Sequence, residues 1–180
     1  MRSLAPAVLV LLCGCVDYAS VDYVIDLRAG KATITWQDLR GEGRDDLATL
    51  LTKLIPEGNF EAEFPRATVL RKEAVPQEGR LDVVVELGLA EPADAGLGAW
   101  DRRNPYRLCP PEDAEFTKTN ADYRDADGCV VWKRGARVLR AQAQMRGEVE
   151  GESLLGEYER WVAEGRPPLE EEGKADPPSP

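Results

Sequence analysis

The sequence has no histidine among its 180 residues, and this absence excludes more chemistry than any other feature of the composition. A chain without imidazole cannot build a Ser-His-Asp or Cys-His nucleophile system, and it cannot ligate a metal ion through histidine. The GxSxG, GxxxxGK and GxGxxG motifs of nucleophile elbows and phosphate-binding loops are also missing. The sequence therefore favours a protein that is not an enzyme. It identifies no catalytic residue, cofactor or metal ligand. Catalysis by a pair of carboxylates is the alternative.

The sequence also lacks an apolar run long enough to span a bilayer. Spanning takes roughly 20 apolar residues, and the run from Leu4 to Leu12 is about half that length. One cation, Arg2, precedes the run, and small or thiol residues follow it. This three-part layout is typical of a secretory signal.

The end of that run, Leu12-Cys13-Gly14-Cys15, resembles the lipobox of bacterial lipoproteins. The resemblance implies that the Cys15 thiol receives a diacylglyceryl group, that the chain is cut before Cys15, and that the new amino group is acylated, for instance with palmitate. Gly14 supplies the small residue that this processing needs before the cysteine, whereas bulky Leu12 disfavours Cys13. Two or three acyl chains hold a protein stably on a membrane. The alternatives are a cleaved secretory signal with two unmodified thiols, and a buried core strand.

Val16 follows the anchor cysteine, where an Asp retains many such lipoproteins at the inner membrane. The resemblance therefore implies the outer membrane, with the protein facing the periplasm or the cell surface. On this basis the chain divides into a signal peptide at 1–14, an anchor and short linker at 15–20, a single domain at 21–163, and an acidic, Pro-rich disordered tail at 164–180.

The shortage of positive charge excludes further functions. The formal net charge is −10, and removal of the signal, which takes away only Arg2, would move it to −11. An acidic surface repels phosphate backbones and anionic head groups. Nucleic acid is therefore not an expected partner, and neither is a membrane surface contacted through basic residues.

Cysteines are also few, and after processing only Cys109 and Cys129 remain besides the anchor. An even pair in an oxidising compartment predicts a disulfide. It would close a loop of about 20 residues and contribute roughly 3 kcal/mol. The spacing is not the CxxC of a redox pair, so we expect a structural staple.

Alternation of apolar and polar residues predicts hairpins at 19–41, 67–90 and 129–145, the third turning at Arg134-Gly135. Helical spacing predicts amphipathic helices at 44–58 and 154–162, both packed into the core. The stretch 91–127 is rich in Pro, Gly, Asp and Asn and predicts irregular structure, with short strands near 106–109 and 116–119. The expected fold class is α+β: an antiparallel sheet of about six strands built from hairpins, two helices packed on it, and a long disulfide-stapled loop region.

One segment of this loop region carries the residue types that anchor interfaces, Trp100, Arg102, Arg103, Tyr106 and Arg107. We expect a binding surface there, or an alternative in which the aromatic rings pack under the loop and the arginines neutralise nearby acids.

Two acidic features are candidates for a chemical role. Asp125 and Asp127 precede Gly128 as in a calcium-binding EF-hand loop, but Tyr123 and Arg134 stand where the Asp and the bidentate Glu are needed. We therefore expect these residues to form a solvated turn, with an irregular calcium site as the alternative. Glu86, within the most apolar strand, is either an acid with a perturbed pKa or a residue that faces solvent.

The resulting functional expectation is an envelope lipoprotein that acts as a non-catalytic binding or structural module, with another envelope protein as one kind of partner. The alternative is an anchored hydrolase that uses a carboxylate pair about 5 to 9 Å apart. Beyond the lipobox, the chain is similar to the uncharacterised small lipoproteins of Gram-negative bacteria, which implies no activity.

Overall fold

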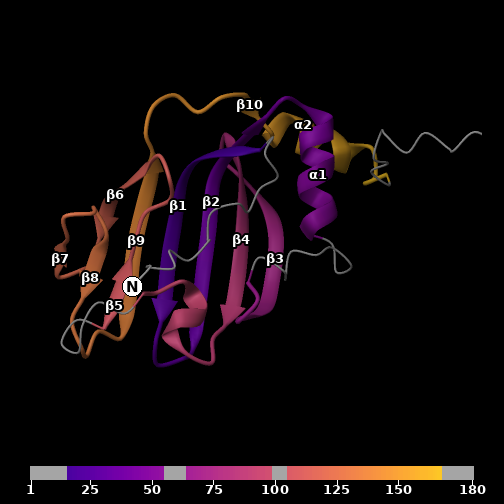
Figure 1. Ribbon diagram of the computed structural model, residues 1–180. Helices are drawn as coiled ribbons and strands as arrows, with labels where there is room; N and C mark the ends of the chain where they lie inside the picture. Colours follow the sequence, from indigo (N-terminus) through magenta and orange to yellow (C-terminus); the bar gives the residue numbers. More distant parts are fainter. Residues whose placement is uncertain (1–15, 55–63, 99–104, 168–180) are drawn as a thin grey trace, which may run out of the picture.

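The computed structural model describes residues 16–54, 64–98 and 105–167. In these ranges the chain folds as the predicted α+β domain, with a seven-stranded antiparallel sheet, a separate three-stranded sheet and two helices (Figure 1). The strands of the main sheet are β1 (Asp17–Asp26), β2 (Lys31–Gly41), β3 (Thr68–Gln77), β4 (Arg80–Gly88), β6 (Ala114–Thr119), β9 (Val138–Met145) and β10 (Glu152–Ser153). The small sheet contains β5 (Tyr106–Leu108), β7 (Tyr123–Arg124) and β8 (Val130–Trp132), the helices are α1 (Arg44–Leu54) and α2 (Leu155–Ala163), and Pro92–Ala95 forms a 3₁₀ turn.

The first two predicted hairpins are confirmed. β1 and β2 pair from Asp17 opposite Arg40 to Asp26 opposite Lys31. β3 and β4 close at Gln77 opposite Arg80, and Gly79, the second of the two turn residues, has a positive φ of 77°, which residues with a Cβ rarely adopt. β1 begins at Asp17, so residues 17–20 of the expected linker are strand, and Val16 is buried.

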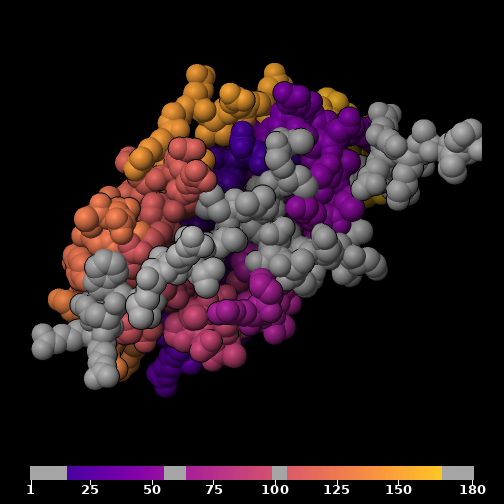
Figure 2. Space-filling model, in the orientation of Figure 1, coloured from indigo at the N-terminus to yellow at the C-terminus, as the bar shows by residue number. Residues whose placement is uncertain are grey.

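The strands of the main sheet lie in the order β3-β4-β2-β1-β9-β6, and β10 extends the pairing of β2. Every second residue of the central strands is buried on one face, including Tyr23, Trp36 and Val85. Helix α1 packs its apolar stripe into the core at the β3 end of this face (Figures 1 and 2). Asp46 in the first turn accepts a hydrogen bond from the backbone N–H of Glu42 at 2.5 Å, which helps to fix where the helix begins.

The third predicted hairpin is wrong, because β8 and β9 belong to different sheets. β8 lies between β5 and β7, whereas β9 pairs with β1 and β6. The burial pattern explains the difference: all three residues of β8 are buried, whereas β9 alternates as a strand with one open face does. The turn near Gly135 therefore joins two sheets and not two neighbouring strands.

The second predicted helix is present but less buried than its apolar stripe implies. Leu154, just before α2, is 1% exposed, yet no residue within α2 is fully buried. Tyr158 and Trp161 are half-buried against the core, and Val162 is 37% exposed. Of the predicted tail, residues 168–180 lie outside the described residues. Within the described ranges, no helix combines the length and the apolarity needed to cross a membrane.

Candidate functional site

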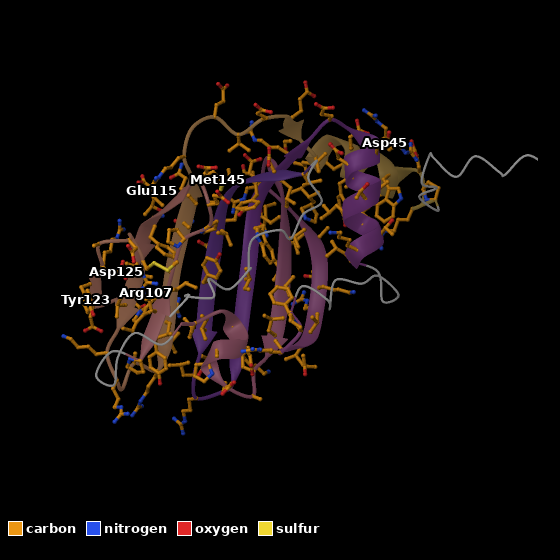
Figure 3. The ribbon with its side chains drawn as sticks, in the orientation of Figure 1. Asp45, Arg107, Glu115, Tyr123, Asp125 and Met145 are labelled. Atoms are coloured by element: carbon orange, nitrogen blue, oxygen red, sulfur yellow. A yellow bond between two sulfur atoms is a disulfide. The ribbon has the colours of Figure 1, made fainter. Side chains whose placement is uncertain are left out.

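The predicted Cys109–Cys129 disulfide is present. Cys109 directly follows β5 and Cys129 directly precedes β8, and these two strands are antiparallel neighbours that pair at Leu108 and Val130. The bond therefore closes one end of the small sheet, as Figure 3 shows beside Arg107 and Asp125. It ties the loop between the two cysteines to the rest of the domain.

Arg107, one of the predicted binding residues, directs its charge into this loop. Its Nε donates to Asp125 Oδ2 at 2.6 Å and its Nη2 to Asp127 Oδ2 at 2.8 Å. The Asp125 side chain is only 4% exposed, and its Oδ1 accepts the backbone N–H groups of Asp127 and Cys129, both at 3.0 Å. For Arg107 the structure therefore favours the alternative in which arginine neutralises nearby acids. Tyr106 is half-buried on β5.

The other members of the predicted surface, Trp100, Arg102 and Arg103, lie outside the described residues, as do Cys15 and the lipobox. Their roles stay predictions. In the described part of the chain, no group of three or more Cys, Asp or Glu side chains could hold a metal ion.

Two further acidic residues, Asp122 in the loop closed by the disulfide and Glu86 on β4, make ordinary protein contacts. The carboxylate of Asp122 accepts the backbone N–H of Lys133 at 2.8 Å, and this hydrogen bond holds the pKa of Asp122 below its usual range. Glu86 faces the side of the sheet opposite α1, 38% exposed, with Arg71 Nη1 3.4 Å from its Oε1. Glu86 is therefore a solvent-facing strand residue.

A polar network on this open face of the main sheet was missed by the sequence analysis. Gln37 on β2 donates from Nε2 to Asp22 Oδ2 at 2.8 Å, and its Oε1 accepts hydrogen bonds from Ser20 Oγ at 2.8 Å and Gln142 Nε2 at 3.3 Å. The four side chains come from β1, β2 and β9. Because the third hairpin was mispredicted, the sequence could not bring Gln142 next to Asp22.

A shallow pocket of about 430 Å³ lies next to this network, over β1, β9 and the edge strand β6. Its polar lining residues are Asp22, Lys118, Thr119, Asn120, Arg140 and Gln142. Burial raises the pKa of the Asp22 carboxyl, and the nearby Lys118 ammonium partly offsets that effect. The pocket thus places two cations beside a half-buried carboxylate and an amide.

A second hollow, of about 620 Å³, lies between α1, α2 and the edge strand β3. Its apolar walls come from Leu51 and Leu54 on α1, Ala74 on β3, and Tyr158 and Trp161 on α2. This hollow explains why the stripe of α2 is only half-buried: the two helices lie side by side without filling the space between them.

Addition of a further strand is disfavoured at both described edges of the main sheet. β3 and β6 each carry a register irregularity, between Val69 and Arg71 and between Phe116 and Lys118. Bulges and charged side chains on edge strands hinder pairing with another chain. Binding by side chains in a pocket is therefore a better hypothesis than binding by sheet extension.

Comparisons of the chain with protein-family models, curated proteins and solved structures give no match. The functional argument consequently depends on the residues and geometry described above.

Proposed function

We propose that this protein is a bacterial envelope lipoprotein, anchored through acylated Cys15, whose α+β domain is a non-catalytic binding or structural module. The observation that carries the proposal is the sequence Leu12-Cys13-Gly14-Cys15 at the end of a short apolar run near the first Met. The Cys109–Cys129 disulfide supports it, because such bonds persist in oxidising compartments outside the cytoplasm. The residue after Cys15 is Val, which favours the outer membrane, with the domain in the periplasm or at the cell surface.

The binding part of the proposal is supported by the open face of the main sheet. It carries a pocket with polar and charged side chains, whereas α1 occupies the opposite face. Ligand sites are commonly pockets of roughly 300 to 1,000 Å³ with a few placed polar groups. A non-catalytic module needs no histidine, and the chain has none.

The anchor would also orient the domain. Only Val16 separates Cys15 from Asp17 at the start of β1, so the chain allows at most about 7 Å between their Cα atoms. The end of the sheet where β1 begins, near Asp45, Glu115 and Met145 in Figure 3, would then face the bilayer. Lys31, opposite Asp26 at the other end of β1, would lie about 30 Å farther out.

The first experiment is the intact mass and cell fractionation of the full-length protein, extracted from membranes, for wild type, Cys15→Ala and Cys13→Ala. We expect the wild type and Cys13→Ala to lose residues 1–14, gain acyl mass and fractionate with membranes. Cys15→Ala should stay unprocessed or become soluble. An unacylated wild-type chain in the soluble fraction, or equal behaviour of the two variants, would reject the anchor.

The orientation has its own test in the acylated protein. A fluorophore attached at Glu152→Cys, next to the start of β1 through the pairing of Glu152 with Gly41, should be quenched strongly by lipids with nitroxide head groups. The same fluorophore at Lys31→Cys should be quenched several-fold less. Equal quenching at the two positions would contradict an end-on arrangement.

A further inference from the structure

The pocket on the open face brings together two cations from different strands. Lys118 on β6 pairs with Gln142 on β9, and Arg140 is two residues before Gln142. Diagonal neighbours across paired strands lie about 7 to 8 Å apart. The two long basic side chains can therefore reach one small group on a ligand.

The charges of Lys118 and Arg140 are not neutralised by ion pairs within the described residues. Both side chains are exposed; the nearest carboxylate described, that of Asp22, is close enough to Lys118 for the ammonium to lower its pKa, but it forms no direct ion pair with either cation. Residues 130–147 hold five Lys or Arg and no Asp or Glu in a chain of net charge −10. Two of the five, Lys133 and Arg146, pair with Asp122 and Glu115 from other segments, and the rest add positive charge near the pocket. The local field therefore favours an anion, although the whole chain is acidic.

The other side of the pocket offers hydrogen-bond acceptors. The Asp22 carboxylate accepts a hydrogen bond from Gln37 Nε2, and a carboxylate has about four acceptor positions, so acceptor capacity is left for ligand hydroxyls. Gln142 adds an amide carbonyl. Asn120 and Thr119 are already used to hold the loop: Asn120 Nδ2 donates to Val138 O and Thr119 Oγ1 donates to Arg140 O, each at 2.9 Å.

From this arrangement we propose that the pocket binds a sugar acid or sugar phosphate, with Lys118 and Arg140 holding the anionic group while Asp22 and Gln142 accept hydrogen bonds from ring hydroxyls. Guanidinium and ammonium groups bind carboxylates and phosphates through charge-assisted hydrogen bonds. The volume of about 430 Å³ suits a ligand of one or two sugar rings. This inference rests on the proposed role as a binding module and names its ligand class.

The test is a titration of the isotope-labelled full-length protein, purified in detergent and followed by NMR, with galacturonate, glucose 6-phosphate, glucose and inorganic phosphate. We expect saturable shifts of β6 and β9 amide signals with galacturonate or glucose 6-phosphate, and the difference between these two identifies the anionic group. Glucose and inorganic phosphate should each bind at least tenfold more weakly. Equal binding of inorganic phosphate and glucose 6-phosphate would overturn the role of the hydroxyl contacts.

The variant Lys118→Gln/Arg140→Gln should weaken binding at least tenfold. The control is Arg124→Gln/Arg134→Gln, which removes the same charge at two exposed residues that do not line the pocket. It should change the affinity by less than twofold, and an equal loss in both variants would show general charge attraction and overturn the site. No binding of either anionic sugar would also overturn it. The mass of Cys15-acylated protein is measured separately, so failure of the pocket is distinguishable from failure of the anchor.

Discussion

Asp125 and Asp127 offer a controlled measurement of what holds the stapled loop. Both carboxylates pair with the guanidinium of Arg107, but the Asp125 side chain is 4% exposed and that of Asp127 is 73% exposed. Asp125 also accepts two backbone N–H groups, whereas Asp127 contributes the exposed ion pair alone. The two positions therefore share a partner and differ in burial.

The two substitutions to Ala should have different costs. Asp125→Ala removes the more buried of the two carboxylates that pair with Arg107, whose side chain is only 14% exposed, and leaves two N–H donors without an acceptor. Removing one member of a buried, hydrogen-bonded ion pair costs about 3 to 5 kcal/mol. An exposed pair contributes at most about 1 kcal/mol, so Asp127→Ala should cost no more than that.

The assay is urea unfolding of the oxidised protein, followed by tryptophan fluorescence, for wild type and both variants. Asp125→Asn is a useful third variant, because it keeps an acceptor for the backbone N–H groups and removes only the charge, so its cost should fall between the other two. Equal free energies of unfolding for Asp125→Ala and Asp127→Ala would refute the reasoning. The burial of Asp125 and its backbone hydrogen bonds would then have no energetic role.

Three further outcomes are expected. Reduction of the Cys109–Cys129 bond should lower the free energy of unfolding by roughly 3 kcal/mol, and a urea midpoint that does not change with reductant would contradict the staple role. Burial raises the pKa of Asp22 in the folded state, so the ionised form of Asp22 destabilises the fold. This destabilisation is absent below the pKa that Asp22 has in the unfolded chain, and it is complete once the pH has risen through the pKa that Asp22 has in the folded protein. The stability of Asp22→Asn relative to wild type should therefore be greater at pH 7 than at pH 3 in urea titrations, and the opposite trend would show that the charge stabilises the fold. Gly151 has φ +81° and a Cβ there would lie 2.8 Å from a backbone nitrogen of β2, whereas Gly147 has φ +86° with open space around it. Gly147→Ala should therefore lower the free energy of unfolding by about 1 to 2 kcal/mol, and Gly151→Ala should lower it by clearly more. Equal melting temperatures of the two variants would contradict the close approach at Gly151.

Local signals predicted the parts of the fold that depend on neighbours in sequence. The apolar positions Val21, Tyr23 and Ile25 alternate with polar ones, and the structure buries all three on one face. The stripe of α1 likewise became its buried side, and the acidic first turn lies at the helix N-terminus. These features were predictable because side-chain period and turn chemistry act over a few residues.

Partner choice between distant strands was not predictable in the same way. A turn at Arg134-Gly135 between two apolar segments matches a hairpin, yet β9 pairs along β1 from Ser20 to Asp26, while β8 is held by β5 and the disulfide. β9 is eight residues long and can pair along most of the free edge of β1, whereas β8, with three residues, would form fewer backbone hydrogen bonds there. The competition between strands is decided by contacts that are far apart in sequence.

The same long-range pairing creates the candidate site. The net charge of the whole chain is negative, but this sum conceals the local excess of Lys and Arg in residues 130–147. Pairing of β9 with β1 on one side and β6 on the other places Arg140 near Asp22 and Lys118. An anion-binding pocket can therefore form on an acidic protein, because the ligand responds to the charges within a few ångströms and salt screens the more distant ones over about 8 to 10 Å.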